Sequence, residues 1–100
     1  MLDNVLTGKQ KRFLRSLGST LDPVVQIGKA GVIDSVVTSA QDVIEVRELI
    51  KVRVLQNSPE EPKDAIGALA EAIDAELVQV IGRNGLLYKH NPEKSKIELP

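Results

Sequence analysis

The sequence predicts an α/β domain with the element order αβαβαββ around a small mixed four-stranded sheet. Three observations favour this fold: apolar residues recur at helical spacing in three segments, they alternate with polar residues in a central segment, and a hairpin signal lies near the C-terminus. One hundred residues can build one core without disulfide or metal staples. We therefore expect a single domain over residues 1–100, with helices and sheet in a two-layer α+β arrangement.

The first predicted helix runs from Thr7 to about Leu17. Thr7 and Gln10 have the spacing of a capping box, and Gly18 suits the position just after the helix. One arc of this helix is mostly apolar, with Gln10, Phe13, Leu14 and Leu17. The other arc is basic and carries no acid: Lys9, Lys11, Arg12 and Arg15. Most charged helical arcs are only solvated, so this arc becomes a candidate binding surface only if it packs beside another cationic group.

A strand and a glycine loop follow. Pro23 introduces the extended run from Val24 to Ile27, which ends in the loop Gly28-Lys29-Ala30-Gly31 before a helix over residues 33–46. Two glycines let a backbone approach a ligand closely, the helix start supplies free N–H groups, and Lys29 adds a positive charge, a combination suited to phosphate. The spacing alone also fits a plain strand-to-helix connection, because 7 glycines give about 0.5 such matches by chance.

The remaining elements complete the sheet. Residues 48–55 alternate and predict a strand with Ile50, Val52 and Val54 on its buried face and Lys51 and Arg53 on the other. Residues 66–73 carry the apolar stripe of a third helix. Residues 77–81 and 86–89 predict a hairpin turning at residues 83–85, and residues 97–99 predict a short final strand. Strands separated by helices usually pair in parallel, whereas the hairpin adds an antiparallel strand.

A second glycine match, Gly82 to Gly85, contains an Asn-Gly pair between apolar runs, and we interpret it first as a hairpin turn. Arg83 within it is a candidate for extending a basic surface. The lone His90 has no clustered metal ligands around it in the sequence and is predicted to lie on the surface. No nucleophile elbow, phosphate-binding Gly-Lys loop or distinctive carboxylate pair is present. We expect no enzyme activity, metal, cofactor or small-molecule substrate.

The charge is unevenly distributed. The net charge is −1, yet residues 1–31 carry 5 − 2 = +3, residues 32–80 carry 4 − 10 = −6, and residues 81–100 carry 4 − 2 = +2. A basic face can therefore coexist with an acidic total. The chain has no cysteine, no signal-peptide pattern and no apolar run of membrane-spanning length, so we expect a cytoplasmic protein without a membrane partner. With only Phe13 and Tyr88 as aromatics, it lacks the means to build a base-stacking platform.

Several blocks of the sequence together resemble a known family. They are residues 6–11, residues 21–31, residues 48–54, residues 80–83, residues 87–88 and residues 97–100. In this order and spacing the chain resembles the CRM domain, in the free-standing bacterial form called YhbY-type, over essentially its whole length. One departure concerns the position two residues after the loop: the family often has threonine there, whereas this chain has Ile33, which cannot cap a helix.

The resemblance implies an RNA-binding domain similar in fold to the C-terminal domain of the third bacterial translation initiation factor. It also implies that the loop of Gly28, Lys29, Ala30 and Gly31 contacts RNA as in KH domains, with Lys9, Lys11, Arg12 and Arg15 on a basic helix. Bacterial members are associated with precursors of the large ribosomal subunit. The predicted function is therefore a ribosome assembly factor that binds ribosomal RNA backbone. The alternative is a protein-interaction adapter on the ribosome, and the sequence leaves open whether Arg83, Lys51 and Arg53 touch RNA.

Overall fold

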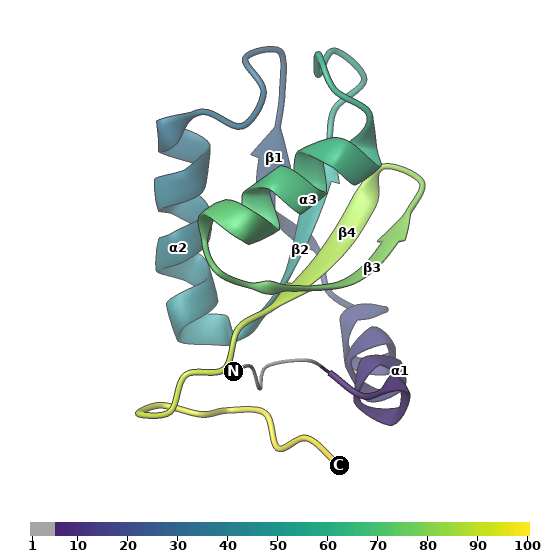
Figure 1. Cartoon of the computed structure of the whole chain (residues 1–100), viewed down its shortest axis with the longest axis vertical. Helices are drawn as coiled ribbons and strands as arrows, with labels where there is room; N and C mark the ends of the chain where they lie inside the picture. Colours follow the sequence, from purple (N-terminus) through teal and green to yellow (C-terminus); the bar gives the residue numbers. More distant parts are fainter. Residues whose placement is uncertain (1–5) are drawn as a thin grey trace.

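The computed structural model describes residues 6–100, and within them three helices and four strands follow one another in the predicted order (Figure 1). They are α1 (Gly8–Gly18), β1 (Pro23–Ile27), α2 (Asp34–Arg47), β2 (Leu49–Val54), α3 (Pro62–Ala72), β3 (Glu76–Ile81) and β4 (Asn84–Tyr88). The predicted α/β class is confirmed. None of the helices in this part of the chain is long and apolar enough to cross a membrane.

The four strands form one mixed sheet in the order β1-β2-β4-β3. β1 pairs with β2 in parallel, as expected for strands joined through a helix, and β3 and β4 form the expected antiparallel hairpin. β4 also pairs antiparallel with β2, so it lies between β2 and β3. The C-terminal hairpin therefore supplies a central strand as well as an edge strand.

Helices α2 and α3 cover one face of the sheet (Figure 1). The alternation predicted for β2 is confirmed, because Ile50, Val52 and Val54 are all buried against these helices, whereas Arg53 is exposed. The helices contribute a matching apolar set to the same core: Ala40, Ile44, Ala65, Ile66, Leu69, Ala70 and Ile73. This core fixes which face of β2 carries its basic side chains.

Helix α1 packs on the opposite face and adds a partial third layer to the predicted two. Its Leu14 is fully buried against Leu49, Leu86 and Tyr88. The predicted capping box is confirmed, since Gln10 N donates to Thr7 Oγ1 at 3.1 Å and Thr7 N donates to Gln10 Oε1 at 3.0 Å. The apolar arc is only partly buried, because α1 covers one end of the sheet and leaves Phe13 and Leu17 exposed.

The predicted final strand at residues 97–99 is wrong. Ile97 and Leu99 are half-buried against the Leu14 cluster, but the segment joins no strand. The reason lies in its backbone donors: the N–H groups of Lys96 and Ile97 donate to the carboxylate of Glu48 rather than to a neighbouring strand. Side-chain packing and one carboxylate thus replace a strand pairing.

Two glycines have different roles from those expected. Gly18 is the last residue of α1, not the residue after it. A Cβ there would lie 2.5 Å from Leu86 Cδ1, so the glycine allows the helix to approach the sheet.

The hairpin turns at Gly82 and Arg83, with Gly82 at φ +59°, and not at Asn84-Gly85. Gly85 lies within β4, where a Cβ would lie 2.6 Å from Ile66 Cδ1.

Candidate nucleic-acid interface

The loop from Gly28 to Gly31 is a tight turn with one residue in a left-handed conformation. Gly31 N donates to Gly28 O at 3.0 Å and so closes the turn, and Ile33 N donates to Gly31 O at 3.1 Å. Gly31 has φ +77°, a left-handed conformation that favours glycine. Gly28 has no such requirement, and its nearest potential contact with a Cβ is an ordinary 3.6 Å to Leu55 Cδ1. The two glycines therefore contribute to the loop in different ways.

The loop is supported by the segment that joins β2 to α3. Leu55 N donates to Ile27 O at 2.8 Å, which extends the pairing of β1 and β2 to the start of the loop. On the other side of the loop, Gly31 is buried, and a Cβ on it would lie 3.4 Å from Pro59 Cγ. The same Cβ would lie 3.9 Å from Glu60 Oε1, so one carboxylate stands close to the turn. Lys29, at the tip, is exposed.

Helix α2 begins directly after the loop without a side-chain cap. Ile33 occupies the N-cap position with φ −97° and ψ 171°, and its side chain accepts no hydrogen bond, as its identity predicts. The first helical bond runs from Val37 N to Ile33 O. The preceding N–H groups of the first turn have no capping side chain, so they are open to an acceptor such as a phosphate oxygen, in competition with the charge of Asp34.

The basic helix does not pack beside the loop, as a shared phosphate surface would have required. Helix α1 precedes β1 and the loop follows it, so the two lie toward opposite ends of the sheet (Figure 1). The five residues of β1 span about 17 Å at about 3.3 Å per residue. Lys9 and Arg12 on α1 are exposed, and Lys11 and Arg15 are half-buried. A ligand that touches both the loop and α1 must extend along the sheet.

The sheet face opposite α2 and α3 carries basic side chains between the glycine loop and α1. Lys51 and Arg53 lie on this face of β2, because the alternate residues of the strand are buried under the helices. Arg53 pairs across the sheet with Asn84, and Lys51 pairs with Leu86. The helical layer has the opposite charge, with five acids against Arg47 and Lys63: Asp34, Asp42, Glu45, Asp64 and Glu71. Half of the ten acids in residues 32–80 therefore lie in the helical layer on the other side of the sheet.

Arg83 lies next to the segment that supports the loop. Its Nη1 donates to Leu55 O at 3.2 Å, and its own carbonyl accepts from Val54 N at 2.7 Å. The side chain is half-buried. Arg83 therefore adds a positive charge close to the end of β2, beyond Arg53, and also holds the β2–α3 segment in place.

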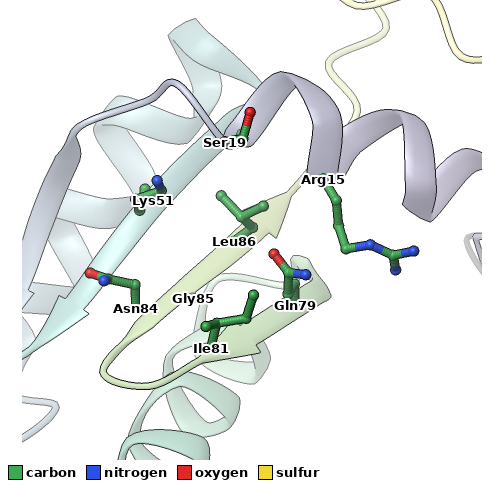
Figure 2. A pocket seen from close by; sticks show the side chains of 9 residues that line it. Arg15, Ser19, Lys51, Gln79, Ile81, Asn84, Gly85 and Leu86 are labelled. Atoms are coloured by element: carbon green, nitrogen blue, oxygen red, sulfur yellow. The ribbon is translucent and has the colours of Figure 1, made fainter.

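A cavity of about 210 Å³ opens on this sheet face beneath the C-terminal end of α1 (Figure 2). Gly85 and Leu86 of β4 form its floor. Gly18 at the end of α1 and Ser19 just after it form one wall, and Arg15 extends down from the helix. Side chains from three strands complete it: Lys51, Gln79, Ile81 and Asn84. No acid lines it. The sequence did not indicate Gln79 or Asn84, because its pattern predicts a turn at Asn84 and Gln79 follows a bulge that alters the alternation of β3.

Glu48 is a further residue that the sequence did not indicate. It is the one buried charged residue within residues 6–100, with φ +63° between α2 and β2. Burial raises the pKa of its carboxyl, but hydrogen bonds from the backbone of Asn91, Lys96 and Ile97, together with His90, lower the pKa below its ordinary value. Asn91 N donates to Oε2 at 2.7 Å. Glu48 and His90 thus anchor the C-terminal segment, and no group of residues suited to a metal ion occurs in the part of the chain that the structure describes.

Comparison with known proteins identifies the family. The model of the CRS1/YhbY (CRM) domain matches residues 6–89. The chain belongs to this family. It is 49% identical over 96 residues to a Bacillus subtilis protein named probable RNA-binding protein YqeI, covering 96% of this chain and all of the relative. It is 37% identical to a Haemophilus influenzae protein named RNA-binding protein, covering 95% of each chain.

A solved structure agrees with the CRM assignment. The solution structure of the hypothetical protein SAV1595 from Staphylococcus aureus superposes with a TM-score of 0.81 at 49% identity, over 96% of this chain and all of the other. The resemblance noted in the sequence is therefore confirmed at the level of family and fold. In this CRM domain, hydrogen bonds of Leu55 join the strand before the loop Gly28–Gly31 to the end of β2 and to Arg83. Most of the basic side chains of α1 lie apart from this group.

Proposed function

We propose that this protein is an RNA-binding protein that holds RNA by its phosphate backbone. Phosphate contacts come from Lys29 and the uncapped N–H groups at the start of α2, which Gly28 and Gly31 let the RNA approach closely. These contacts continue along the sheet through Arg53 and Lys51. Arg83 supports the path near the loop, and Arg15 extends it at the far end. The names of the relatives from Bacillus subtilis and Haemophilus influenzae agree with this function.

One observation carries the proposal. The left-handed turn at Gly31 leads directly into a helix whose N-cap is Ile33, so uncapped N–H groups and the exposed Lys29 meet at the same place. Backbone N–H groups at a helix start bind anions in many proteins, and here a cationic side chain stands beside them. The acidic residues on α2 and α3 repel RNA from the other side, which favours a single bound orientation.

The experiment is a salt titration of RNA binding, comparing Lys29→Ala with Lys63→Ala as a matched control. Lys63 is an exposed lysine on α3, within the acidic helical layer. Lys29→Ala is expected to weaken binding to all RNA sequences alike and to reduce the slope of log affinity against log salt by about 0.7 for single-stranded RNA. Lys63→Ala is expected to leave both unchanged. An unaltered affinity and slope in Lys29→Ala contradicts the role of the loop.

We further propose that the RNA is ribosomal RNA in precursors of the large subunit, which makes the protein a non-enzymatic assembly factor in the cytoplasm. Family resemblance supports this finer statement. Crosslinking in cells, followed by sequencing of the attached RNA, tests it directly. Purified precursor particles treated with nuclease provide the contrasting result: retention of this protein through protein contacts alone would favour an adapter without direct RNA contact.

A further inference from the structure

The cavity beneath α1 combines features that a phosphate path does not need. Lys51 can serve a phosphate, but Gln79 and Asn84 are uncharged amides, and Ile81 is a large apolar side chain that is 63% exposed. Ligand sites typically join an apolar surface to a few polar groups that fix orientation. At about 210 Å³ the cavity is smaller than the roughly 300–1,000 Å³ of sites for drug-sized ligands. Its size therefore suits one planar ring system better than a larger ligand.

Strand register explains how these side chains come together. Lys51, Leu86 and Gln79 form one row across β2, β4 and β3, and Arg53, Asn84 and Ile81 form the next row. The bulge between Leu77 and Gln79 places Gln79 and Ile81 on the same face as Asn84. In Figure 2 the amide of Gln79 points toward α1 and that of Asn84 toward β2, on either side of the floor made by Gly85 and Leu86.

We propose that this cavity takes one unpaired base of the bound RNA, with a preference for adenine; this inference rests on the proposed RNA binding. The ring lies over Leu86 and against Ile81, and the amides of Gln79 and Asn84 bond its edge. A side-chain amide offers one donor and one acceptor group, which match the amino group and ring nitrogen of adenine. Lys51 binds the adjacent phosphate, and its neighbour Arg53 continues the path toward the glycine loop.

The charge of the cavity favours this occupant. Among the residues that the structure describes, the two ionisable lining residues, Arg15 and Lys51, are both cations, so a negatively charged chain that delivers a base is attracted to the cavity. Within residues 6–100, the amides of Gln79 and Asn84 make no hydrogen bond to another side chain or to the backbone, and they are available to a ligand. A base is also recognised here without an aromatic platform, because hydrogen bonds to its edge and contact with an aliphatic side chain replace stacking.

The test compares three single strands of about ten nucleotides with equal phosphate number: oligoadenylate, oligouridylate and a fully abasic strand. Wild-type protein is expected to bind oligoadenylate about fivefold or more tightly than the abasic strand. Gln79→Ala and Asn84→Ala are each expected to reduce this preference while leaving affinity for the abasic strand unchanged. Gln26→Ala, an exposed amide on the same sheet face but outside the cavity, is the matched control and is expected to keep the preference.

The outcomes separate this inference from the proposed function. If the wild type binds all three strands equally and Lys29→Ala weakens each, RNA binding stands and the base site is overturned. A base preference that survives in Gln79→Ala and Asn84→Ala overturns the base site as well. If the wild type binds none of the strands and no structured RNA, the proposed function itself falls. Neither amide is part of the core, so circular dichroism of each variant is expected to show a retained fold.

Discussion

The buried carboxylate of Glu48 lies 3.3 Å from Nδ1 of His90, and this pair joins the start of β2 to the C-terminal segment. Three backbone N–H groups of that segment, from Asn91, Lys96 and Ile97, also donate to Glu48. The segment in turn places Ile97 and Leu99 against Leu14 of α1. The carboxylate of Glu48 therefore helps to position α1, the helix that covers the cavity over Gly85 and Leu86.

Replacing Glu48 by glutamine is expected to lower the free energy of unfolding at neutral pH by about 1–3 kcal/mol, because the neutral amide is a poorer acceptor for the three N–H donors. The folded pKa of Glu48 lies below its ordinary value of 4.5, so its stabilising contribution is complete above that value and is lost as the pH falls through the lowered pKa. The difference between wild type and Glu48→Gln should therefore shrink in acid.

Urea unfolding at a series of pH values measures this difference. Glu71→Gln is the control, because Glu71 is exposed on α3 and makes no comparable contacts among the described residues. A gap between wild type and Glu48→Gln that stays constant from neutral pH to well below pH 4.5 would contradict the assigned pKa direction.

The two loop glycines are expected to respond differently to alanine. Gly31→Ala forces a side chain into a left-handed conformation, so it should lower the free energy of unfolding by about 1–2 kcal/mol. Gly28→Ala meets only ordinary contacts and should leave stability within about 0.5 kcal/mol, while weakening RNA binding through the added bulk. Thermal unfolding and RNA binding are measured on both. Unchanged RNA affinity in Gly28→Ala would show that RNA does not approach the loop closely there.

Gly31→Asp should weaken RNA binding more than Gly31→Ala, because it adds a negative charge close to that of Glu60 as well as bulk. Aspartate tolerates the left-handed conformation of Gly31 better than alanine does, so weaker RNA binding by Gly31→Asp reflects charge and bulk rather than greater backbone strain. Equal RNA affinities in the two folded variants would argue against phosphate near this turn.

Arginines on the two sides of the molecule form a matched pair. Arg53→Ala removes a cation from the open sheet face, and Arg47→Ala removes one from the helical layer. Both side chains are exposed, so neither substitution disturbs the core. RNA affinity and its salt slope should fall in Arg53→Ala, by about 0.7 in slope, and stay unchanged in Arg47→Ala. The opposite ranking would place RNA on the helical side.

The close approach of α1 to the sheet is tested at Gly18. Gly18→Ala brings a Cβ within 2.5 Å of Leu86 Cδ1, and overpacking of this kind costs about 1–3 kcal/mol. Leu86→Ala alone costs about 2–5 kcal/mol through the cavity that it leaves. The double variant should lose less stability than the sum, because the smaller residue 86 makes room for the new methyl group. Simple additivity in urea unfolding would show that the two residues do not press against each other.

Local sequence patterns predicted most of the elements. The capping box of Thr7 and Gln10, the alternation of Ile50, Val52 and Val54, and the position of the glycine loop all depend on near neighbours in the chain, and each is found in the structure. The absence of a side-chain cap at Ile33 is equally a property of one residue type. Such features can be predicted because hydrogen bonding and periodicity act over a few residues.

Features that depend on long-range contacts were missed. The sequence predicts Gly18 and Gly85 as helix-end and turn residues, whereas in the fold a side chain from a distant element leaves no room for a Cβ at either position. Residues 97–99 have the composition of a strand, but Glu48, nearly fifty residues earlier, supplies their hydrogen-bond acceptor. A strand prediction from local sequence cannot include a hydrogen-bond acceptor that lies far away in the chain.

By itself, the sequence determined the α/β class, the element order, the position of the glycine loop and the uneven charge of this protein. Only the tertiary structure decided that most of the basic residues of α1 lie apart from the loop, that Lys51 and Arg53 form the path between them, and that Gln79, Ile81 and Asn84 share a cavity. The physical reason is that sheet register and helix packing bring these side chains together, and both are set by contacts between residues far apart in the chain.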